Sequence, residues 1–98
     1  MMEVTILRLA RDDLREIREY LSELGEGPAK KFRASFEKFN GQVAEMPYMF
    51  SHYECNPVYR RAVLAYDYLV FYRVDEDKEI VKVYRVLHGK RLINPLLG

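Results

Sequence analysis

Residues 59–87 contain three short hydrophobic runs separated by tight turns, a pattern typical of β-strands, and the third run alternates hydrophobic and polar positions with a period of two. Three runs rich in β-branched and aromatic residues cover residues 59–64, 68–74 and 80–87. An acidic link, residues 75–78, joins the second run to the third and indicates a hairpin. This stretch therefore predicts a three-stranded antiparallel meander on which the rest of the chain packs.

The third run alternates most clearly, so regular pleating predicts which of its side chains share a face. One face receives Ile80, Lys82, Tyr84, Val86 and His88, and the other receives Val81, Val83, Arg85 and Leu87. Arg85 is then expected on the opposite face from Lys82 and His88, unless a β-bulge intervenes. Because a slip of one residue would exchange the two faces, the register should be firmly set.

The N-terminal half begins with an expected strand and continues with helical periodicity. A short apolar run at residues 4–7 predicts an edge strand that pairs with the later sheet. Asp12 or Asp13 is expected to cap the first helix, and Glu16 completes a capping box with Asp13. The apolar residues of this helix recur every three or four positions, which gives one stripe: Leu14, Ile17, Leu21 and Leu24.

A second helix follows directly, because residues 25–28, Gly-Glu-Gly-Pro, suit the end of one helix and the start of another. Its apolar seam also has spacings of three and four: Ala29, Phe32, Phe36, Phe39, Val43 and Met46. Pro47 ends it. Two helices with so short a link predict an antiparallel hairpin, and the aromatic-rich stretch 47–57 is expected to cross from the helices to the sheet.

The composition supports one folded domain, residues 1–98, of the α+β class. Hydrophobic residues are 49% of the chain and charged residues 32%, which is ordinary for a folded protein. No apolar run reaches the roughly 18 residues of a membrane span, and the N-terminus has no secretion signal. Cys55 is the single cysteine, so no internal disulfide can form, and a cytoplasmic location without membrane contact is expected.

Charge is distributed unevenly although the net charge is only +1. Residues 1–54 contain 8 Lys/Arg and 10 Asp/Glu, whereas residues 55–98 contain 8 and 5. Three of those five acids, Asp75, Glu76 and Asp77, lie in one turn, so the expected strands are more basic than the totals suggest. This asymmetry permits an acidic partner.

The whole chain resembles the RelE/ParE superfamily of toxins from type II toxin–antitoxin modules, which include plasmid stabilisation systems. Four motifs carry the resemblance, in this order: ARDDLREI at 10–17, YRR at 59–61, YLVFYRV at 68–74 and RVLHGKR at 85–91. The phrases VFYR and RVLHG are more similar to the ParE branch. The resemblance implies a small toxin with a strand, a helical hairpin and a meander, neutralised by a cognate antitoxin that wraps it as helix and extended chain. No cofactor is expected.

The two branches imply different chemistry. RelE-like toxins cleave messenger RNA on the ribosome, and ParE-like toxins are reported to inhibit DNA gyrase without a recognised catalytic site. Cleavage through the ribose hydroxyl needs a base, an acid and cations for the phosphorane. If the chain is such a nuclease, the candidate catalytic residues are His88, Arg61, Arg73 and Arg85. Two departures weigh against this activity: Tyr68 stands where RNA-cleaving relatives have an arginine, and Gly89 stands where they have a tyrosine.

The favoured interpretation is therefore a toxin that binds a protein target, with gyrase the first candidate and the ribosome with its message the alternative. A toxin that has lost its activity, and that only binds antitoxin, is a third. The partner-binding surface for target or antitoxin is expected from six residues: Arg73, Arg85, His88, Lys90, Arg91 and Leu97. A toxin–antitoxin hetero-oligomer is a further expectation.

Structural roles compete with these assignments. Arg60 or Arg61 is expected to pair with a helix carboxylate, Glu16 or Glu19, and Arg73 and Arg85 can form salt bridges on the sheet. An exposed groove for an antitoxin helix is a hypothesis for four residues: Tyr20, Tyr48, Met49 and Phe50. The spacing of His52 and Cys55 suits two metal ligands, but there is no second cysteine and only one other histidine, so no metal site is expected.

Overall fold

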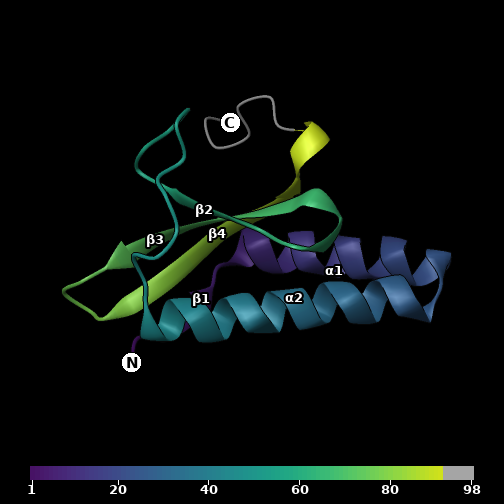
Figure 1. Cartoon of the computed structure of the whole chain (residues 1–98), viewed down its shortest axis with the longest axis horizontal. Helices are drawn as coiled ribbons and strands as arrows, with labels where there is room; N and C mark the ends of the chain where they lie inside the picture. The colour runs from purple at the N-terminus through teal and green to yellow at the C-terminus, as the bar shows by residue number, and fades with distance from the viewer. Residues whose placement is uncertain (92–98) are drawn as a thin grey trace.

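The computed structural model describes residues 1–91 and has the expected α+β architecture (Figure 1). The elements follow the order β1 (Glu3–Ile6), α1 (Arg8–Leu24), α2 (Glu26–Glu45), β2 (Arg60–Val63), η1 (Ala65–Asp67), β3 (Tyr68–Asp75), β4 (Ile80–His88) and η2 (Gly89–Arg91). The strands form one mixed sheet in the order β1-β4-β3-β2, in which only the β1–β4 pair is parallel. Both helices lie against one face of this sheet. No described helix has both the length and the apolar character that crossing a membrane requires.

The helical hairpin is confirmed, but the predicted start of its first helix is wrong. Helix α1 begins at Arg8, its N-cap is Leu7, and no side chain caps it. The reason is that Leu7 continues the β1 pairing by donating its N–H to Val83 O at 3.0 Å, so the helix follows the strand directly. The break between the helices is also shorter than expected, because only Gly25, at φ 132°, separates α1 from α2.

Strand β4 carries a bulge that reverses its face pattern midway. Phe71 of β3 pairs with Arg85 and the next residue, Tyr72, pairs with Val83, so Tyr84 is the extra residue. As a result Val86 joins Val81 and Val83 in the core under the helices, and the predicted uninterrupted alternation is wrong beyond Val83.

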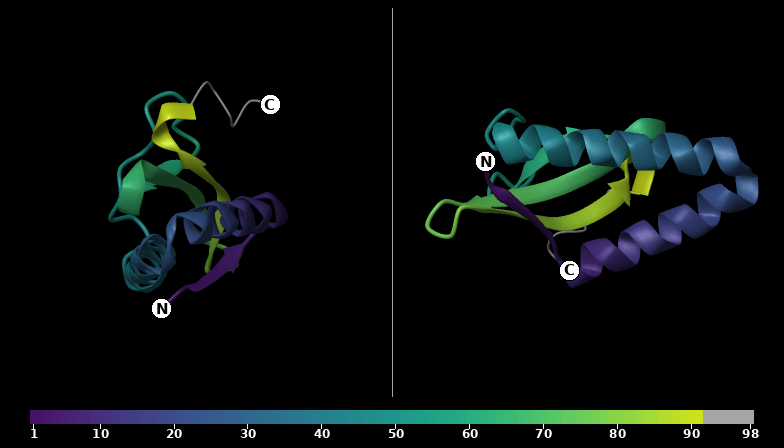
Figure 2. Two further views of the ribbon diagram at one scale, coloured as in Figure 1. Left: turned by 90° about the vertical axis from the view of Figure 1, so that its right-hand side faces the viewer. Right: turned by 90° about the horizontal axis from the view of Figure 1, so that it is seen from below.

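The sheet separates two apolar clusters. The larger cluster fills the space between the helices and the sheet, and Phe32, Phe39, Val70, Tyr72 and Val83 are almost fully buried in it. The smaller cluster lies on the other face of the sheet and consists of Tyr53, Leu69 and Phe71, with Tyr59 and Leu87 packed against it. Seen from the side, η2 lies on the opposite side of the sheet from the helices, and the loop between α2 and β2 starts at the helices and crosses to that side (Figure 2).

That loop is fastened to the sheet by hydrogen bonds, and one of them overturns an expectation about Arg60. The Arg60 guanidinium donates to Phe50 O at 2.7 Å and to Tyr48 O at 3.3 Å. Within residues 1–91, neither Arg60 nor Arg61 forms the expected ion pair with a helix carboxylate. The Tyr72 hydroxyl donates to Pro47 O at 2.9 Å, and burial raises the pKa of Tyr72 to about 12.

Asp13 of helix α1 forms hydrogen bonds with strand β4 beyond the point where the pairing with strand β1 ends. The pairing of β1 with β4 stops at Val83, so the outer edge of β4 has no strand partner beyond that residue. Asp13 Oδ2 accepts the backbone N–H of Val86 at 3.0 Å and the Arg85 Nε–H at 2.7 Å, and its Oδ1 accepts from Arg85 Nη2 at 3.0 Å. These hydrogen bonds raise the pKa of Arg85. The carboxylate thus satisfies a backbone donor and a guanidinium together.

We expect Asp13→Ala to lower the free energy of unfolding by about 2–3 kcal/mol, because it leaves a backbone donor and a part-buried cation without their acceptor. The control is Asp12→Ala, since Asp12 has only an exposed partner, Arg15, at 3.7 Å and should cost less than about 0.5 kcal/mol. Urea unfolding of the three proteins measures both values. Equal stability of the two variants would show that the Asp13 bonds contribute nothing net.

Candidate functional site

A groove of about 730 Å³ lies between α1, the start of α2, η1 and the end of β4. We call it the helix-side groove. Its floor is apolar and includes the buried Ile17, Leu21 and Val86. Its rim carries large apolar side chains that remain open to solvent: Tyr20 is 56% exposed and Leu24 60% exposed. A surface of this kind is suited to an apolar partner.

His88 and Lys90 line the same groove at the end of β4. The bulge places His88 on the helix side of the sheet, where its ring meets Tyr68 edge-on with 5.0 Å between centroids. Tyr68 packs in turn against Phe32 of α2, at 5.2 Å. His88 Nδ1 accepts the backbone N–H of Lys90 at 3.2 Å. The imidazole is therefore held by packing and by one backbone donor, at the side of the sheet that the helices cover.

The turn between β2 and β3 supplies the last wall of this groove and has an unusual backbone. Tyr66 and Asp67 both have positive φ, 61° and 60°, a region that side chains other than Gly and Asn occupy at a cost. Tyr66 is 41% exposed, and the Lys31 ammonium lies 5.4 Å from its ring centre. A Cβ at Gly89 would approach Asp67 O to 3.2 Å, so the turn and the end of β4 are in close contact.

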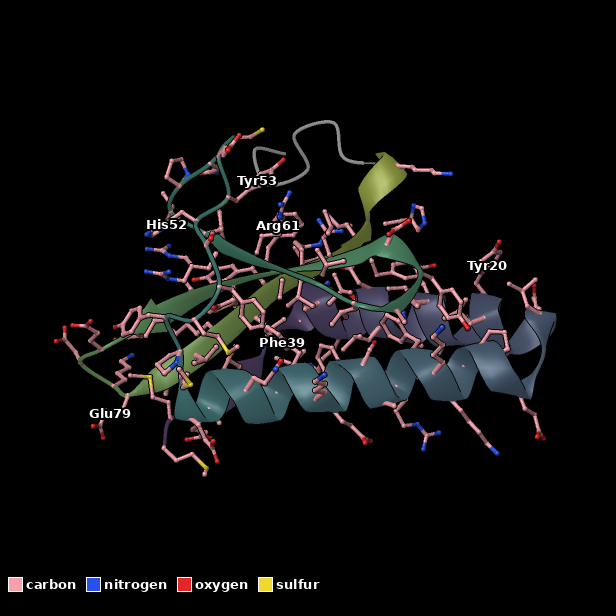
Figure 3. The ribbon with its side chains drawn as sticks, in the orientation of Figure 1. Tyr20, Phe39, His52, Tyr53, Arg61 and Glu79 are labelled. Carbon is pink, nitrogen blue, oxygen red and sulfur yellow. The ribbon has the colours of Figure 1, made fainter. Side chains whose placement is uncertain are left out.

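Arg61 and Arg73 lie on the face of the sheet away from the helices, which we call the open face. Arg61 pairs with Phe71 and Arg73 with Lys82, which places both arginines on the side away from the helices. Figure 3 shows Arg61 and Tyr53 on this side of the sheet and Phe39 on the other. The Arg73 guanidinium lies 6.0 Å from the ring centre of Tyr59 and 5.8 Å from that of Tyr84. These two rings touch each other edge-on at 5.2 Å, so Arg73 is braced by an aromatic pair.

A second hollow, of about 480 Å³, opens beside Arg73; we call it the open-face hollow. Lys82 and Tyr84 line one part of it, and the β3–β4 turn lines the rest with three acids: Asp75, Glu76 and Asp77. Asp75 pairs with Lys82 at 3.4 Å and accepts the Lys78 N–H, which is the main reason that the pKa of Asp75 is lowered. Glu76 accepts a hydrogen bond from the Tyr48 hydroxyl and thereby raises the pKa of Tyr48.

The structure thus divides the predicted site residues among three places. Arg61 and Arg73 lie on the open face, His88 and Lys90 line the helix-side groove, and Arg85 is bound to Asp13. Arg91 belongs to η2 and its side chain is not described, and Leu97 lies outside the described residues.

The groove hypothesised from four aromatic and methionine residues is wrong. Only Tyr20 lines the helix-side groove. Tyr48 bonds to the β3–β4 turn, and Phe50 packs inward against Phe39 and Tyr72. Sequence reasoning missed Leu24 and Tyr66 as groove residues; Leu24 was assigned to the buried stripe of its helix. In residues 1–91, no three side chains of His, Cys, Asp or Glu are grouped as a metal site requires.

Comparison with known proteins agrees with this fold. Residues 4–93 match the family model described as the ParE toxin of the type II toxin–antitoxin system parDE, so the chain belongs to the ParE toxin family. None of the curated proteins matches the chain.

Three solved structures share the architecture at low sequence identity. The chromosomal ParDE system from P. aeruginosa has a TM-score of 0.71 at 19% identity, covering 90% of this chain and 96% of that one. The isolated E. coli RelE toxin has a TM-score of 0.67 at 19% identity, covering 95% and 89%. The intact E. coli RelBE toxin–antitoxin complex has a TM-score of 0.61 at 21% identity, covering 93% and 100%. The fold is therefore common to toxins of both branches.

The strained turn leads to a prediction about stability. Asp67→Gly should raise the free energy of unfolding by about 1 kcal/mol, because glycine occupies the left-handed region without the steric cost paid by Asp67. Chemical denaturation of the variant and the wild type measures the difference. Gly27→Ala, in the first turn of α2 with no atom within 4 Å of the added Cβ, is a positive control, since helix propensity should raise its stability by about 1 kcal/mol. A less stable Asp67→Gly protein would mean that the Asp67 side chain contributes more than its backbone costs.

Proposed function

We propose that this ParE-family toxin acts by binding a protein target, with DNA gyrase the first candidate, and that it does not cleave RNA. One observation carries the proposal: two of the candidate catalytic arginines and the candidate catalytic histidine are separated by the sheet. Arg61 and Arg73 face solvent on the open side, whereas His88 lines the groove on the helix side. A phosphorane on one face of the sheet could not contact both the two arginines and the histidine.

Arg85, the fourth candidate catalytic residue, is also poorly placed for phosphate chemistry. Its guanidinium is already paired with the Asp13 carboxylate through two nitrogens. A phosphate would have to compete with this bidentate pair, and releasing Asp13 would also remove the acceptor of the Val86 N–H. Arg85 is thus better explained as a structural residue than as a stabiliser of a transition state.

The helix-side groove supports a separate role, the binding of the cognate antitoxin. The E. coli RelBE structure is that of a toxin–antitoxin complex, and its toxin shares this fold. Interfaces of lasting complexes are more apolar than those of brief encounters, and the groove combines an apolar floor with exposed Tyr20, Leu24 and Tyr66. An antitoxin segment that buries these side chains would keep the toxin in a hetero-oligomer.

The alternative function is a ribosome-dependent RNA endonuclease, and the open-face arginines are the observation in its favour. Arg61 and Arg73 are both exposed and, among the described residues, neither is paired with a carboxylate. They supply cations for RNA, but the candidate histidine, His88, lines the groove on the other side of the sheet, and His52, bridged to Arg60, has its Nδ1 bonded to Pro57 O at 2.8 Å. Ribosome-bound transcripts cut by the purified protein would favour this alternative.

The target is tested by inducing the toxin without antitoxin in a bacterial host. We expect DNA damage and altered plasmid supercoiling with intact messages, because a gyrase-binding toxin leaves RNA untouched. His88→Ala should arrest growth to within about twofold of the wild type, since removing a general acid–base group would instead cost about a hundredfold or more. Loss of toxicity in a folded His88→Ala protein, together with cut messages, would contradict the proposal.

The groove is tested by Leu24→Glu, a change at an exposed position that should leave the fold intact. A carboxylate buried against the antitoxin without a partner should weaken binding at least tenfold, because desolvating it costs more than about 1.4 kcal/mol. Co-purification and calorimetry with the cognate antitoxin measure the loss. The matched control is Ala34→Glu, on the exposed part of α2. Equal affinity of the two variants would exclude this groove as the antitoxin site.

A further inference from the structure

We infer that the open-face hollow beside Arg73 is the site that recognises the target protein, through a segment that carries an acidic residue next to a basic one. The inference rests on the proposed function, since it assigns the target to a particular surface. It depends on three features of the hollow: a cation that contacts two tyrosines and has no counter-ion in the described part of the chain, three acids that line the same hollow, and a polar character unlike that of the helix-side groove.

Arg73 is prepared to receive a carboxylate. Its side chain is exposed, and within residues 1–91 it forms no ion pair. The touching rings of Tyr59 and Tyr84 both lie against the guanidinium, at 6.0 and 5.8 Å from their centres, so less conformational entropy is lost when it binds. The planar fork matches a carboxylate through two hydrogen bonds. Arginine and tyrosine are also the residues that most often dominate the energy of protein interfaces.

The acidic wall decides between a polypeptide and a nucleic acid. Asp77 lines the same hollow as Arg73 and, among the described residues, has no cationic partner. A polyphosphate strand would gain from Arg73 and Arg61 but would be repelled by Asp77 and by the other acids of the turn. Binding to only two cations, Arg61 and Arg73, also releases few counter-ions from a nucleic acid, so they support only weak non-specific binding. A polypeptide can present both signs, an acid to Arg73 and a base to Asp77.

The polarity of the hollow also distinguishes the target from the antitoxin. Its lining is mostly charged, whereas the helix-side groove has an apolar floor and lies on the other side of the sheet. Polar interfaces are typical of partners that meet and part, and apolar ones of permanent complexes. The open-face hollow therefore suits the target protein, and the helix-side groove suits the antitoxin.

Two charge reversals separate the alternatives: Arg73→Glu and Asp77→Lys. If the hollow binds a segment of mixed charge, both should weaken binding to purified gyrase at least tenfold, because each places like charges together in the interface. Both variants should also lose growth arrest on induction without antitoxin. Arg33→Glu, at an exposed arginine of α2, is the matched control and should behave as the wild type. Co-purification with antitoxin verifies that each variant is folded.

A single-stranded RNA oligonucleotide, followed by fluorescence anisotropy, provides the opposing test. Nucleic acid would lose affinity with Arg73→Glu but gain it with Asp77→Lys, since the second change adds a cation beside the first. That pattern, accompanied by growth arrest that Asp77→Lys strengthens, would overturn the inference in favour of RNA. Growth arrest by Arg73→Glu equal to that of the wild type would also overturn it.

The inference and the proposed target fail in different ways. If the wild type arrests growth without binding gyrase, while both reversals abolish the arrest, gyrase is the wrong target and the hollow still recognises one. If the wild type binds gyrase and both reversals bind equally well, the proposed function stands and the assignment of the hollow is wrong.

Discussion

The contact between Asp13 and the edge of β4 is the interaction on which the arrangement of both surfaces depends. Strand β1 is four residues long, so it pairs with only the first half of β4. Beyond Val83 the backbone of β4 would expose unpaired donors at the edge of the sheet, and such groups are costly to bury without partners. Asp13, in the first turns of α1, accepts a hydrogen bond from one of these donors, the Val86 N–H. This bond fixes the helix against the second half of the strand.

The bulge at Tyr84 lies between the two halves of β4 and reverses which residues of the alternation face the helices. Before it, Val81 and Val83 point to the helices and Lys82 to the open face; after it, Val86 points to the helices. Without the extra residue Val86 would face solvent and Leu87 the core. The bulge therefore keeps an apolar residue under α1 and carries His88 to the groove. It also leaves Tyr84 beside Arg73, where Tyr84 and Tyr59 both contact the guanidinium.

Sequence periodicity was sufficient for the elements and their order but not for the site. The helices were predicted because their apolar residues repeat over several turns, as the seam from Phe32 to Val43 does, and the strands because short runs are rich in apolar, β-branched and aromatic residues. The bulge has no such signal, since Val83, Tyr84 and Arg85 continue a regular strand composition. One unrecognised extra residue was enough to misplace Val86. The capping role given to Asp13 failed for a similar reason, because a carboxylate near a helix start is equally able to bond a strand 73 residues away in sequence.

The groove and the hollow were beyond prediction because each is made by segments that meet only in the folded chain. Tyr66 reaches the groove through two consecutive residues at positive φ, in a turn that lacks the glycine or asparagine expected there. Strain of this kind persists only where the surroundings determine the conformation, and here the close contact between Asp67 and Gly89 does so. The same contact joins the turn to the end of β4, so the wall of the groove and the position of His88 are set together. Under the proposed function, this arrangement lets the toxin bind its antitoxin and its target on different surfaces, since the sheet lies between the groove and the hollow.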